Sequence, residues 1–186
     1  MKTLLVELSV STRNGQFVAR YSEKGLAGLN FPVGQMPSFH CRRRGNESQI
    51  SSAFGASVRD SSRRLLQTKI SRWNRVTGAA LKNILTGRSP GKFPPLDLSE
   101  GTTFQRKVWN TLRKIARGQT KSYGEIARAI GSPRAVRAVG SACGANPIPV
   151  LIPCHRVLAA NKKLGGFSGG LNWKRELLAR EGVMFR

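Results

Sequence analysis

The sequence predicts an α+β protein with a small N-terminal domain of mixed sheet and helix, residues 1–90, and a mainly helical C-terminal domain, residues 91–186. Three observations lead to this prediction. Alternating apolar residues near the N-terminus indicate short strands, apolar residues at helical spacing dominate the rest, and the Gly- and Pro-containing stretch 87–92 separates the two patterns. With 186 residues, the chain is long enough for one compact domain or two small ones.

The first block contains three expected strands followed by helix. Residues 4–10, 16–21 and 26–31 alternate or are rich in apolar residues, and residues 22–25 form a turn between the second and third strands. Residues 32–47 are polar, basic and aperiodic, which predicts a loop. Apolar residues spaced through 54–87 predict one or two helices. The basic segment 35–60 contains no motif that we can assign.

The second block begins near Leu96. Thr102 or Thr103 is expected to cap a helix whose apolar face extends to Ile115. Two shorter helices follow, over 123–130 and 133–143, with Ser132 as the expected N-cap of the second. Two short helices around a tight turn, the second rich in arginine, are typical of a helix-turn-helix, but also of a plain corner between helices.

The charge of the chain indicates a polyanionic partner. There are 32 Lys and Arg residues against 9 Asp and Glu, which gives a net charge of +23 that is shared by both halves. A polyanion relieves the self-repulsion of such a protein, so we expect nucleic acid as the partner, with an anionic membrane surface as the second possibility. A basic surface that only contacts solvent has the same charge count.

The sequence also predicts the compartment. No apolar run approaches the ~20 residues of a membrane span. The apolar stretch at the start of the sequence is too short for the apolar core of a signal peptide. The three cysteines, Cys41, Cys143 and Cys154, are scattered and odd in number, which fits free thiols in a reducing interior. We therefore expect a cytoplasmic protein, or a nuclear one in a eukaryote. The sequence contains no C-x-x-C pair, and we expect neither a metal nor a cofactor.

One dipeptide has the residue types of nucleophilic chemistry. The apolar run 148–153 leads through Pro153 to Cys154, His155 and Arg156. A thiolate is the reactive form of cysteine, and a neighbouring His or cation lowers the thiol pKa or takes its proton. Adjacent side chains on a strand point to opposite faces, but a turn at Pro153 would bring them together. Alone, such a pair is more often structural than catalytic.

Six motifs, in order and at matching spacing, make the chemistry specific. Together they resemble the O6-alkylguanine-DNA alkyltransferases over residues 96–184. The motifs are 122–127 (SYGEIA), 134–140 (RAVRAVG), 146–148 (NPI), 152–157 (IPCHRV), 165–171 (GGFSGGL) and 177–182 (LLAREG). The resemblance implies a helical C-terminal domain with a winged-helix-like helix-turn-helix.

The resemblance implies a role for each of four catalytic residues. Cys154 is the thiolate that attacks the alkyl carbon on guanine O6, and His155 is its base, acting through a water. Glu181 orients that histidine, and Tyr123 gives a proton or hydrogen bond to guanine N3. The alternatives are that Tyr123 only packs the start of its helix and that Glu181 is an ordinary surface acid.

The resemblance also implies residues that bind the base. The carbonyls of Cys154 and Val157 accept from the exocyclic amine, Ser168 contacts O6, and Asn146 braces the turn behind the active-site loop. Ser168 could instead be only a turn residue.

The second short helix is implied to contact DNA. Arg137 is implied to enter the DNA double helix in place of the extruded guanine. The alternative is that Arg137 contacts a phosphate. Small residues allow this helix to press close to a minor groove. The expected DNA-contacting set is Ser132, Arg134, Ala135, Arg137 and Ala138.

The implied function is irreversible transfer of an alkyl group from DNA to the protein itself. The expected partner is duplex DNA that contains O6-alkylguanine, with no membrane and no obligate protein partner, and the expected state is a monomer. Three alternatives remain: a non-catalytic protein that flips alkylguanine and flags it, a transcription regulator, and a thiol protease or redox enzyme. Phe167 stands where many relatives have Tyr, and the zinc ligands of some relatives are not recoverable here.

Overall fold

A three-stranded antiparallel sheet and one long helix form the N-terminal part of the computed structural model, which describes residues 5–32 and 60–185, with side chains in the second range from Arg64 onward. The strands are β1 (Val6–Thr12), β2 (Gly15–Tyr21) and β3 (Leu26–Asn30), in the order β1-β2-β3. The first strand therefore runs from Val6 to Thr12 rather than from 4 to 10. Its end is set by the tight hairpin that pairs Thr12 with Gly15, where Gly15 adopts a φ of 106°.

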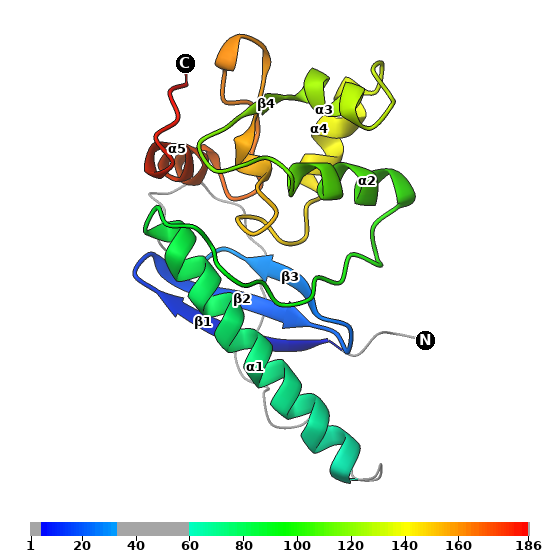
Figure 1. Ribbon diagram of the computed structural model, residues 1–186, viewed down its shortest axis with the longest axis vertical. Coiled ribbons are helices and arrows are strands. Elements are labelled where there is room, and N and C mark those ends of the chain that lie inside the picture. The colour runs from blue at the N-terminus through cyan, green and yellow to red at the C-terminus, as the bar shows by residue number, and fades with distance from the viewer. Residues whose placement is uncertain (1–4, 33–59, 186) are drawn as a thin grey trace, which may run out of the picture.

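Helix α1 (Asp60–Leu85) packs along this sheet (Figure 1). The spacing predicted one or two helices within 54–87, and the structure has one of 26 residues; positions 54–59 lie outside the described residues. Its buried face includes Ile70, Trp73 and Leu81. Tyr21 donates a hydrogen bond of 2.8 Å to the buried Thr77 hydroxyl, which joins the sheet to the helix. Most of the expected loop 32–47 also lies outside the described residues.

The segment that follows α1 returns to the sheet. Leu26 donates to the Pro95 carbonyl at 2.8 Å, and Asp97 donates to the Leu26 carbonyl at 2.8 Å. On the same strand, the Leu29 amide donates to the carbonyl of Pro147, which belongs to the C-terminal part. One continuous hydrophobic core includes side chains of both blocks. The division at residues 90 and 91 therefore stays a prediction.

Helices α2 (Thr103–Leu112) and α3 (Tyr123–Ala129) both begin at a reciprocal cap. Thr102 accepts from the Gln105 amide while the Gln105 side chain accepts from the Thr102 amide, and Ser122 and Glu125 do the same for α3. Thr102 is thus the cap of α2, one of the two residues predicted. The helix ends at Leu112, so Ile115 lies beyond it, although its side chain is buried.

Helix α4 (Val136–Gly144) corrects one prediction. Ser132 was expected to cap a helix over 133–143, but the helix begins at Val136 and its N-cap is Ala135. The backbone of Ser132 is used otherwise: its amide donates to the Ala127 carbonyl, which closes α3, and its carbonyl accepts from Ala135. The turn between the two helices needs these residues, so the cap signal at Ser132 does not start a helix.

The remaining elements surround residues 154–158. A 3₁₀ turn, η1 (Cys154–Arg156), leads into β5 (Val157–Leu158), which pairs in parallel with β4 (Lys121–Ser122). After η2 (Ala160–Lys162) comes the last helix, α5 (Leu171–Arg180). In Figure 1 these elements form the upper half of the molecule, above the sheet and α1. Within the described ranges, no helix is long and apolar enough to cross a membrane.

Candidate active site

A short loop with a single asparagine at its base presents Cys154. The Asn146 amide donates to the Ile152 carbonyl at 2.9 Å, and its oxygen accepts from the Ile148 amide at 3.1 Å. Asn146 therefore joins the two ends of the loop 146–152 through its side-chain amide. The turn expected at Pro153 is present, because the Arg156 amide donates to the Pro153 carbonyl at 3.0 Å.

The Cys154 thiol is buried and protonated near neutral pH. Its residue is 4% exposed, and burial raises the pKa of the thiol to about 11, against a hydrogen bond from Asn146 and the charge of Lys174. The Asn146 amide reaches Sγ at 3.1 Å, a contact that the sequence did not predict. A thiolate on Cys154 therefore needs a base that accepts its proton.

His155 has the geometry of such a base. It is fully buried, and its Nε2 lies 3.1 Å from Oε1 of Glu181. Burial lowers the pKa of this imidazole, although Glu181 opposes the shift, so the ring is neutral at pH 7. Because a carboxylate only accepts, Nε2 must hold the ring proton. The lone pair is then on Nδ1, a buried atom that has no hydrogen-bond partner among the described residues.

Arg156 holds the same carboxylate from the other side. Its Nε lies 2.9 Å from Oε2 of Glu181 and its Nη2 lies 2.8 Å from Oε1, while Nη1 donates to the Ile115 carbonyl at 2.6 Å. Burial would raise the pKa of Glu181, but the hydrogen bonds and charges of His155 and Arg156 outweigh it and lower the pKa to about 2. Glu181 is therefore a buried anion, and not the surface acid of the alternative interpretation.

The parallel pairing of β4 with β5 brings Tyr123 toward the same loop, because Tyr123 directly follows β4. Its ring lies between Gly140 of α4 and Gly165: a Cβ at Gly165 would be 3.1 Å from the phenol oxygen. Burial raises the pKa of Tyr123 to about 12. The phenol is thus a protonated hydrogen-bond donor at neutral pH.

Lys174 is a site residue that the sequence analysis missed. Its side chain comes from α5 and is fully buried; Nζ donates to the Val157 carbonyl at 2.7 Å and to the Gly166 carbonyl at 3.2 Å. Burial lowers the pKa of Lys174 to about 8. The signal was its position in the buried i, i+3, i+4 pattern with Leu177 and Leu178.

The carbonyl of Val157, expected to accept from guanine, therefore already accepts from Lys174. A carbonyl oxygen has two lone pairs, so a second donor is still possible. Ser168 is an exposed residue of the partly buried loop 165–170, and within the described part of the chain it forms no hydrogen bond with Cys154, His155 or Tyr123.

Aromatic side chains connect this loop to the N-terminal sheet. Phe167 lies edge-on to His155, with ring centroids 6.4 Å apart, and edge-on to Phe31, with centroids 5.7 Å apart. Phe31 also contacts Trp173 at 5.1 Å between centroids, and a Cβ at Gly169 would be 2.4 Å from its ring. Phe31, the residue after β3, thus packs against the loop 165–170.

The residues expected to contact DNA lie on one side of α4 and its preceding turn. Arg134, Arg137 and Ala138 are exposed, and Ser132 and Ala135 are partly exposed. The opposite side of α4 is buried through Val139, Ala142 and Cys143, and Trp109 donates to the Ala142 carbonyl at 2.8 Å. Trp109, Trp173 and Cys143 are buried in the core.

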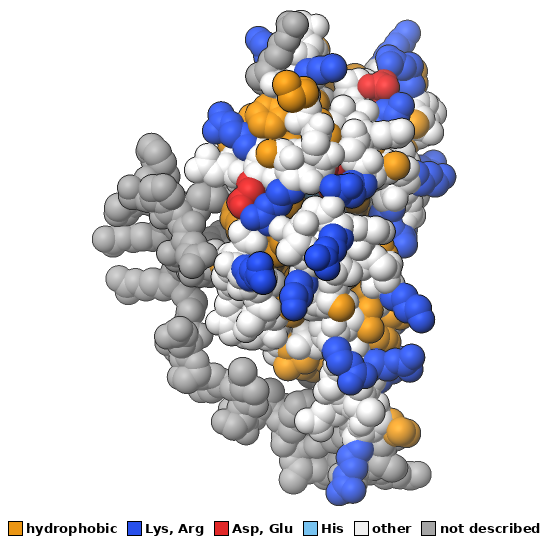
Figure 2. Space-filling view, turned by 60° about the vertical axis from the view of Figure 1, so that its left-hand side comes forward, with side chains coloured by type: hydrophobic (Ala, Val, Ile, Leu, Met, Phe, Trp, Pro, Cys, Tyr) orange, Lys and Arg blue, Asp and Glu red, His pale blue; other side chains and the backbone are white. Residues whose placement is uncertain are grey.

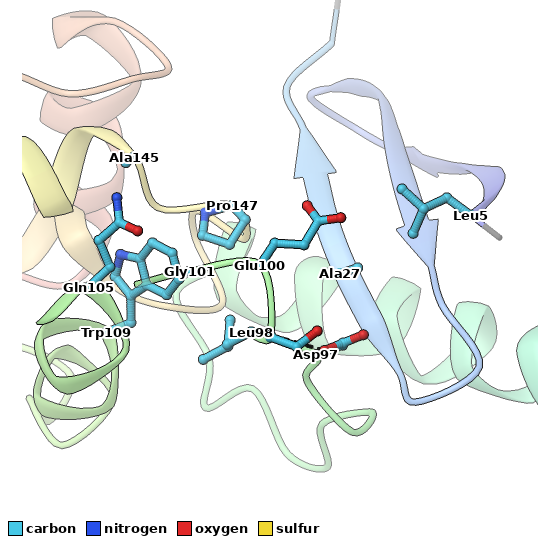
Figure 3. Close-up of a pocket in the computed structure, with 11 residues that line it drawn as sticks. Leu5, Ala27, Asp97, Leu98, Glu100, Gly101, Gln105, Trp109, Ala145 and Pro147 are labelled. Carbon is cyan, nitrogen blue, oxygen red and sulfur yellow. Dashed lines mark hydrogen bonds between the residues drawn. The ribbon is translucent and has the colours of Figure 1, made fainter. Parts of the chain in front are cut away.

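A pocket of about 250 Å³ lies away from these residues. Figure 3 shows it between β3, the segment 97–101 and α2, with Asp97, Glu100 and Trp109 among its lining side chains. None of the expected catalytic residues lines it. Among the described residues there is also no group of three or more His, Cys, Asp or Glu that could hold a metal ion.

Comparison with known proteins was made for the sequence and for the fold. Residues 103–183 match the family described as 6-O-methylguanine DNA methyltransferase, DNA binding domain. Proteins named methylated-DNA–protein-cysteine methyltransferase match at 55% identity over 83 residues in Methanosarcina acetivorans and at 57% over 86 residues in Mycolicibacterium paratuberculosis. These matches cover 45% and 46% of this chain, and 53% and 52% of the relatives. The chain thus spans about half the length of the curated relatives it matches.

The structural similarity extends over almost the whole chain. The crystal structure of Mycobacterium tuberculosis OGT in complex with DNA superposes with a TM-score of 0.65 and 33% identity, covering 95% of this chain and 92% of that one. An O6-methylguanine-DNA methyltransferase from Pyrococcus kodakaraensis, 22% identical, has the same fold with a TM-score of 0.57.

Proposed function

Because this chain belongs to the 6-O-methylguanine DNA methyltransferase family, we propose that it repairs DNA by direct reversal, transferring the alkyl group of O6-alkylguanine irreversibly to Cys154. The observation that carries this proposal is the linked set of Cys154, a neutral His155 with a free Nδ1, and the buried Glu181 anion behind it. A nucleophile, a base and a residue that orients the base are the parts that nucleophilic catalysis requires.

The reaction begins with loss of the thiol proton. His155 accepts it at Nδ1 through one bridging water, and Glu181 stabilises the imidazolium through Nε2. Sγ then attacks the alkyl carbon in line with the bond to O6, so that an S–C bond forms and the C–O6 bond breaks. The electron pair of the broken bond passes into the purine. The net change exchanges the thiol proton for the alkyl group.

The leaving guanine is stabilised by groups around the loop. The Tyr123 phenol gives a proton or hydrogen bond to N3, the carbonyls of Cys154 and Val157 accept from the exocyclic amine, and Ser168 contacts O6. Tyr123 regains its proton as His155 loses its own. The thioether on Cys154 has no leaving route, so each molecule acts once.

The target base must leave the stacked duplex before Cys154 can reach it, at a cost of a few kcal/mol. We propose that α3 and α4 act as the helix-turn-helix of a winged-helix-like domain that binds duplex DNA as a monomer. The exposed residues Ser132, Arg134, Ala135 and Ala138 then contact the duplex, and Arg137 takes the place of the extruded guanine.

Stoichiometry tests this function. Repaired guanines are counted after excess duplex with O6-methylguanine is added to the protein, and we expect a plateau at about one per molecule. Cys154→Ala should abolish repair while DNA binding persists, and Cys143→Ala is the matched control that should repair normally. Turnover well beyond one, or loss of repair only in Cys143→Ala, contradicts the proposal. DNA binding and lesion recognition by wild-type protein without any transfer would instead support the non-catalytic flipping protein.

A further inference from the structure

The peptide bond that joins Arg180 to Glu181 is held by groups that the proposed chemistry does not use. Nη2 of Arg117 donates to the Arg180 carbonyl at 3.0 Å. A Cβ added at Gly87 would lie 2.9 Å from the same oxygen, so the chain after α1 also approaches this peptide closely. The Gly118 amide lies 3.4 Å from Oε2 of Glu181 and donates to it. Two segments outside α5 therefore contact Glu181 and the peptide before it.

The side chain of Arg180 extends these contacts to the N-terminal part of the molecule. The last four carbonyls of a helix lack partners within it. In α1, the carbonyls of residues 82–84 accept from the amides of residues 86–88, and the fourth carbonyl, that of Leu85, accepts from Nη1 of Arg180. The same nitrogen donates at 3.2 Å to Oδ1 of Asn14, in the hairpin between β1 and β2. Figure 1 shows α5 directly above this end of α1, and one guanidinium group joins the two helices and the sheet.

Arg180 differs from most surface cations of this chain. Figure 2 shows a face on which Lys and Arg side chains greatly outnumber Asp and Glu. The Arg180 side chain is 25% exposed, and its Nη2 pairs with the Glu176 carboxylate one turn earlier in α5. Glu176 also accepts from the Asn14 amide at 3.4 Å, so the guanidinium lies in a closed set of contacts. Because Nη1 and Nη2 already donate within the protein, a role inside the protein fits Arg180 better than a contact to phosphate.

The position of Glu181 decides whether its carboxylate stays in contact with His155. Nε2 of His155 lies 3.1 Å from Oε1 of Glu181, near the upper end of hydrogen-bond distances, so a small shift of the end of α5 would break this contact. We propose that Arg180 is a positioning residue for alkyl transfer: it fastens the end of α5 to α1 and to the β1–β2 hairpin, and so holds the Glu181 carboxylate on His155. This role rests on the proposed function, in which His155 is the base.

Single-turnover kinetics with three variants test this role. Transfer is measured at a series of concentrations of duplex with O6-methylguanine, which gives the maximal rate, the half-saturating DNA concentration and the active fraction of the protein. The variants are Arg180→Gln, Arg180→Lys and, as a milder change that removes the hydrogen bond to the Arg180 carbonyl, Arg117→Gln. The matched control is Arg175→Gln, which removes the same charge from an exposed position of the same helix. Arg180→Gln and the control are also made in a Glu181→Gln background.

We expect the maximal rate of Arg180→Gln to fall roughly 10- to 100-fold, the cost of a small misplacement of a catalytic group, while the half-saturating DNA concentration stays unchanged. Arg180→Lys keeps the charge but lacks the planar fork, so it should rescue poorly. Arg117→Gln should slow transfer by less, and Arg175→Gln should match the wild type. In the Glu181→Gln background, Arg180→Gln should cost less than about twofold, because the carboxylate that it positions is already absent.

Equal slowing by Arg180→Gln in both backgrounds would overturn the inference, as would full rescue by Arg180→Lys. A defect confined to the half-saturating DNA concentration would contradict it in favour of a contact to DNA, and a defect confined to the active fraction would contradict it in favour of a role in folding only.

Denaturant unfolding at pH 7 separates this inference from the proposed function, because it requires no transfer. Glu181→Gln should cost less stability in the Arg180→Gln background than in the wild type. Equal costs in the two backgrounds would reject the positioning role even where transfer to Cys154 takes place. Absence of transfer by the wild type would refute the proposed function, and the unfolding comparison would still decide whether Arg180 holds Glu181 in place.

Discussion

At the scale of single residues, the chemistry depends on which groups share a proton. The free protein combines a thiol of raised pKa with a neutral imidazole and an ionised carboxylate. In the proposed reaction, Cys154 need not be ionised beforehand, because His155 takes the thiol proton during transfer. The state of His155 therefore decides the pH dependence of transfer.

The pH dependence of the transfer rate tests whether His155 is the base. The wild-type transfer rate should be nearly flat from pH 6.5 to about 8, where Lys174 begins to lose its charge, and should fall in acid below the ordinary histidine pKa of 6.5, where Nδ1 becomes protonated. In His155→Ala, thiolate must come from direct ionisation, so the rate should rise about tenfold per pH unit in the same range. Single-turnover rates from pH 5 to 9 measure this. A flat profile in His155→Ala would show that the histidine is not the base.

Lys174 should act as a positioning residue for the Val157 and Gly166 carbonyls. Lys174→Met keeps the length of the side chain but removes its charge and donors, and a charge-assisted hydrogen bond contributes about 1.5–3 kcal/mol. We expect transfer to slow by roughly 10- to 100-fold, with the acid limb of the pH profile shifted to higher pH because the His155 imidazolium loses a nearby cation that lowers its pKa. Lys163→Met, at an exposed position, is the control. A variant that is less stable but has an unshifted pH profile would leave Lys174 as a structural group only.

At the scale of elements, some features follow from sequence and others do not. The cap at Thr102 is predictable because capping needs only residues within one turn of the helix. The start of α4 was predicted wrongly because Ser132 has a competing role, the backbone bonds that close α3. The role of Lys174 depends on carbonyls that are 17 and 8 residues away, and no local pattern specifies such partners. The pairing of Glu181 with His155 was inferred only through the family resemblance.

The contact between η1 and the end of α5 should be sensitive to acid. The pKa of Glu181 is about 2, below its ordinary value of 4.5, so its contribution is complete above pH 4.5 and is lost as the pH falls from 4.5 to 2. The shift corresponds to about 3 kcal/mol. Glu181→Gln should therefore be less stable than the wild type at pH 7, and the difference should vanish near pH 2. Denaturant unfolding across this range measures it, and a difference independent of pH would contradict the ion-pair explanation.

Arg137 in the first turn of α4 tests the proposed extrusion. If it replaces the extruded base, Arg137→Ala should slow repair by roughly 10- to 1000-fold while DNA affinity changes far less, and Arg137→Lys should rescue poorly because it lacks the planar guanidinium. Repair is compared for O6-methylguanine opposite cytosine, in a single strand and opposite an abasic site, where extrusion costs less. An equal defect in all three contexts would leave Arg137 as one more phosphate contact.

At the scale of the whole molecule, net charge and core packing have different roles in the proposed function. Under the proposed function, the net charge of +23 supplies affinity for DNA that does not depend on base sequence, as a protein that must inspect every base pair requires. The continuous core fixes the site instead: Phe31 at the end of the N-terminal sheet supports the loop that carries Phe167 and Ser168. Composition predicts the first property directly. The second depends on contacts between distant segments, which composition does not reveal.

Duplex binding should accordingly depend strongly on salt and weakly on sequence. Each neutralised phosphate contributes about −0.9 to the log–log salt slope, so a handful of contacts gives a slope of several units. Titrations of undamaged duplexes of unrelated sequence at several salt concentrations measure both properties. A flat salt response contradicts the electrostatic account, and a strong preference for one sequence would favour a transcription regulator.

The most direct test of the central claim is to measure the mass of the protein after incubation with the proposed substrate. The protein is incubated with duplex DNA that contains O6-methylguanine, digested and examined by mass spectrometry. The account predicts the mass of one added methyl group, about 14 Da, on the peptide that contains Cys154, together with restored guanine in the DNA. An unmodified Cys154 peptide, or a methyl group on the peptide that contains Cys143, would contradict it.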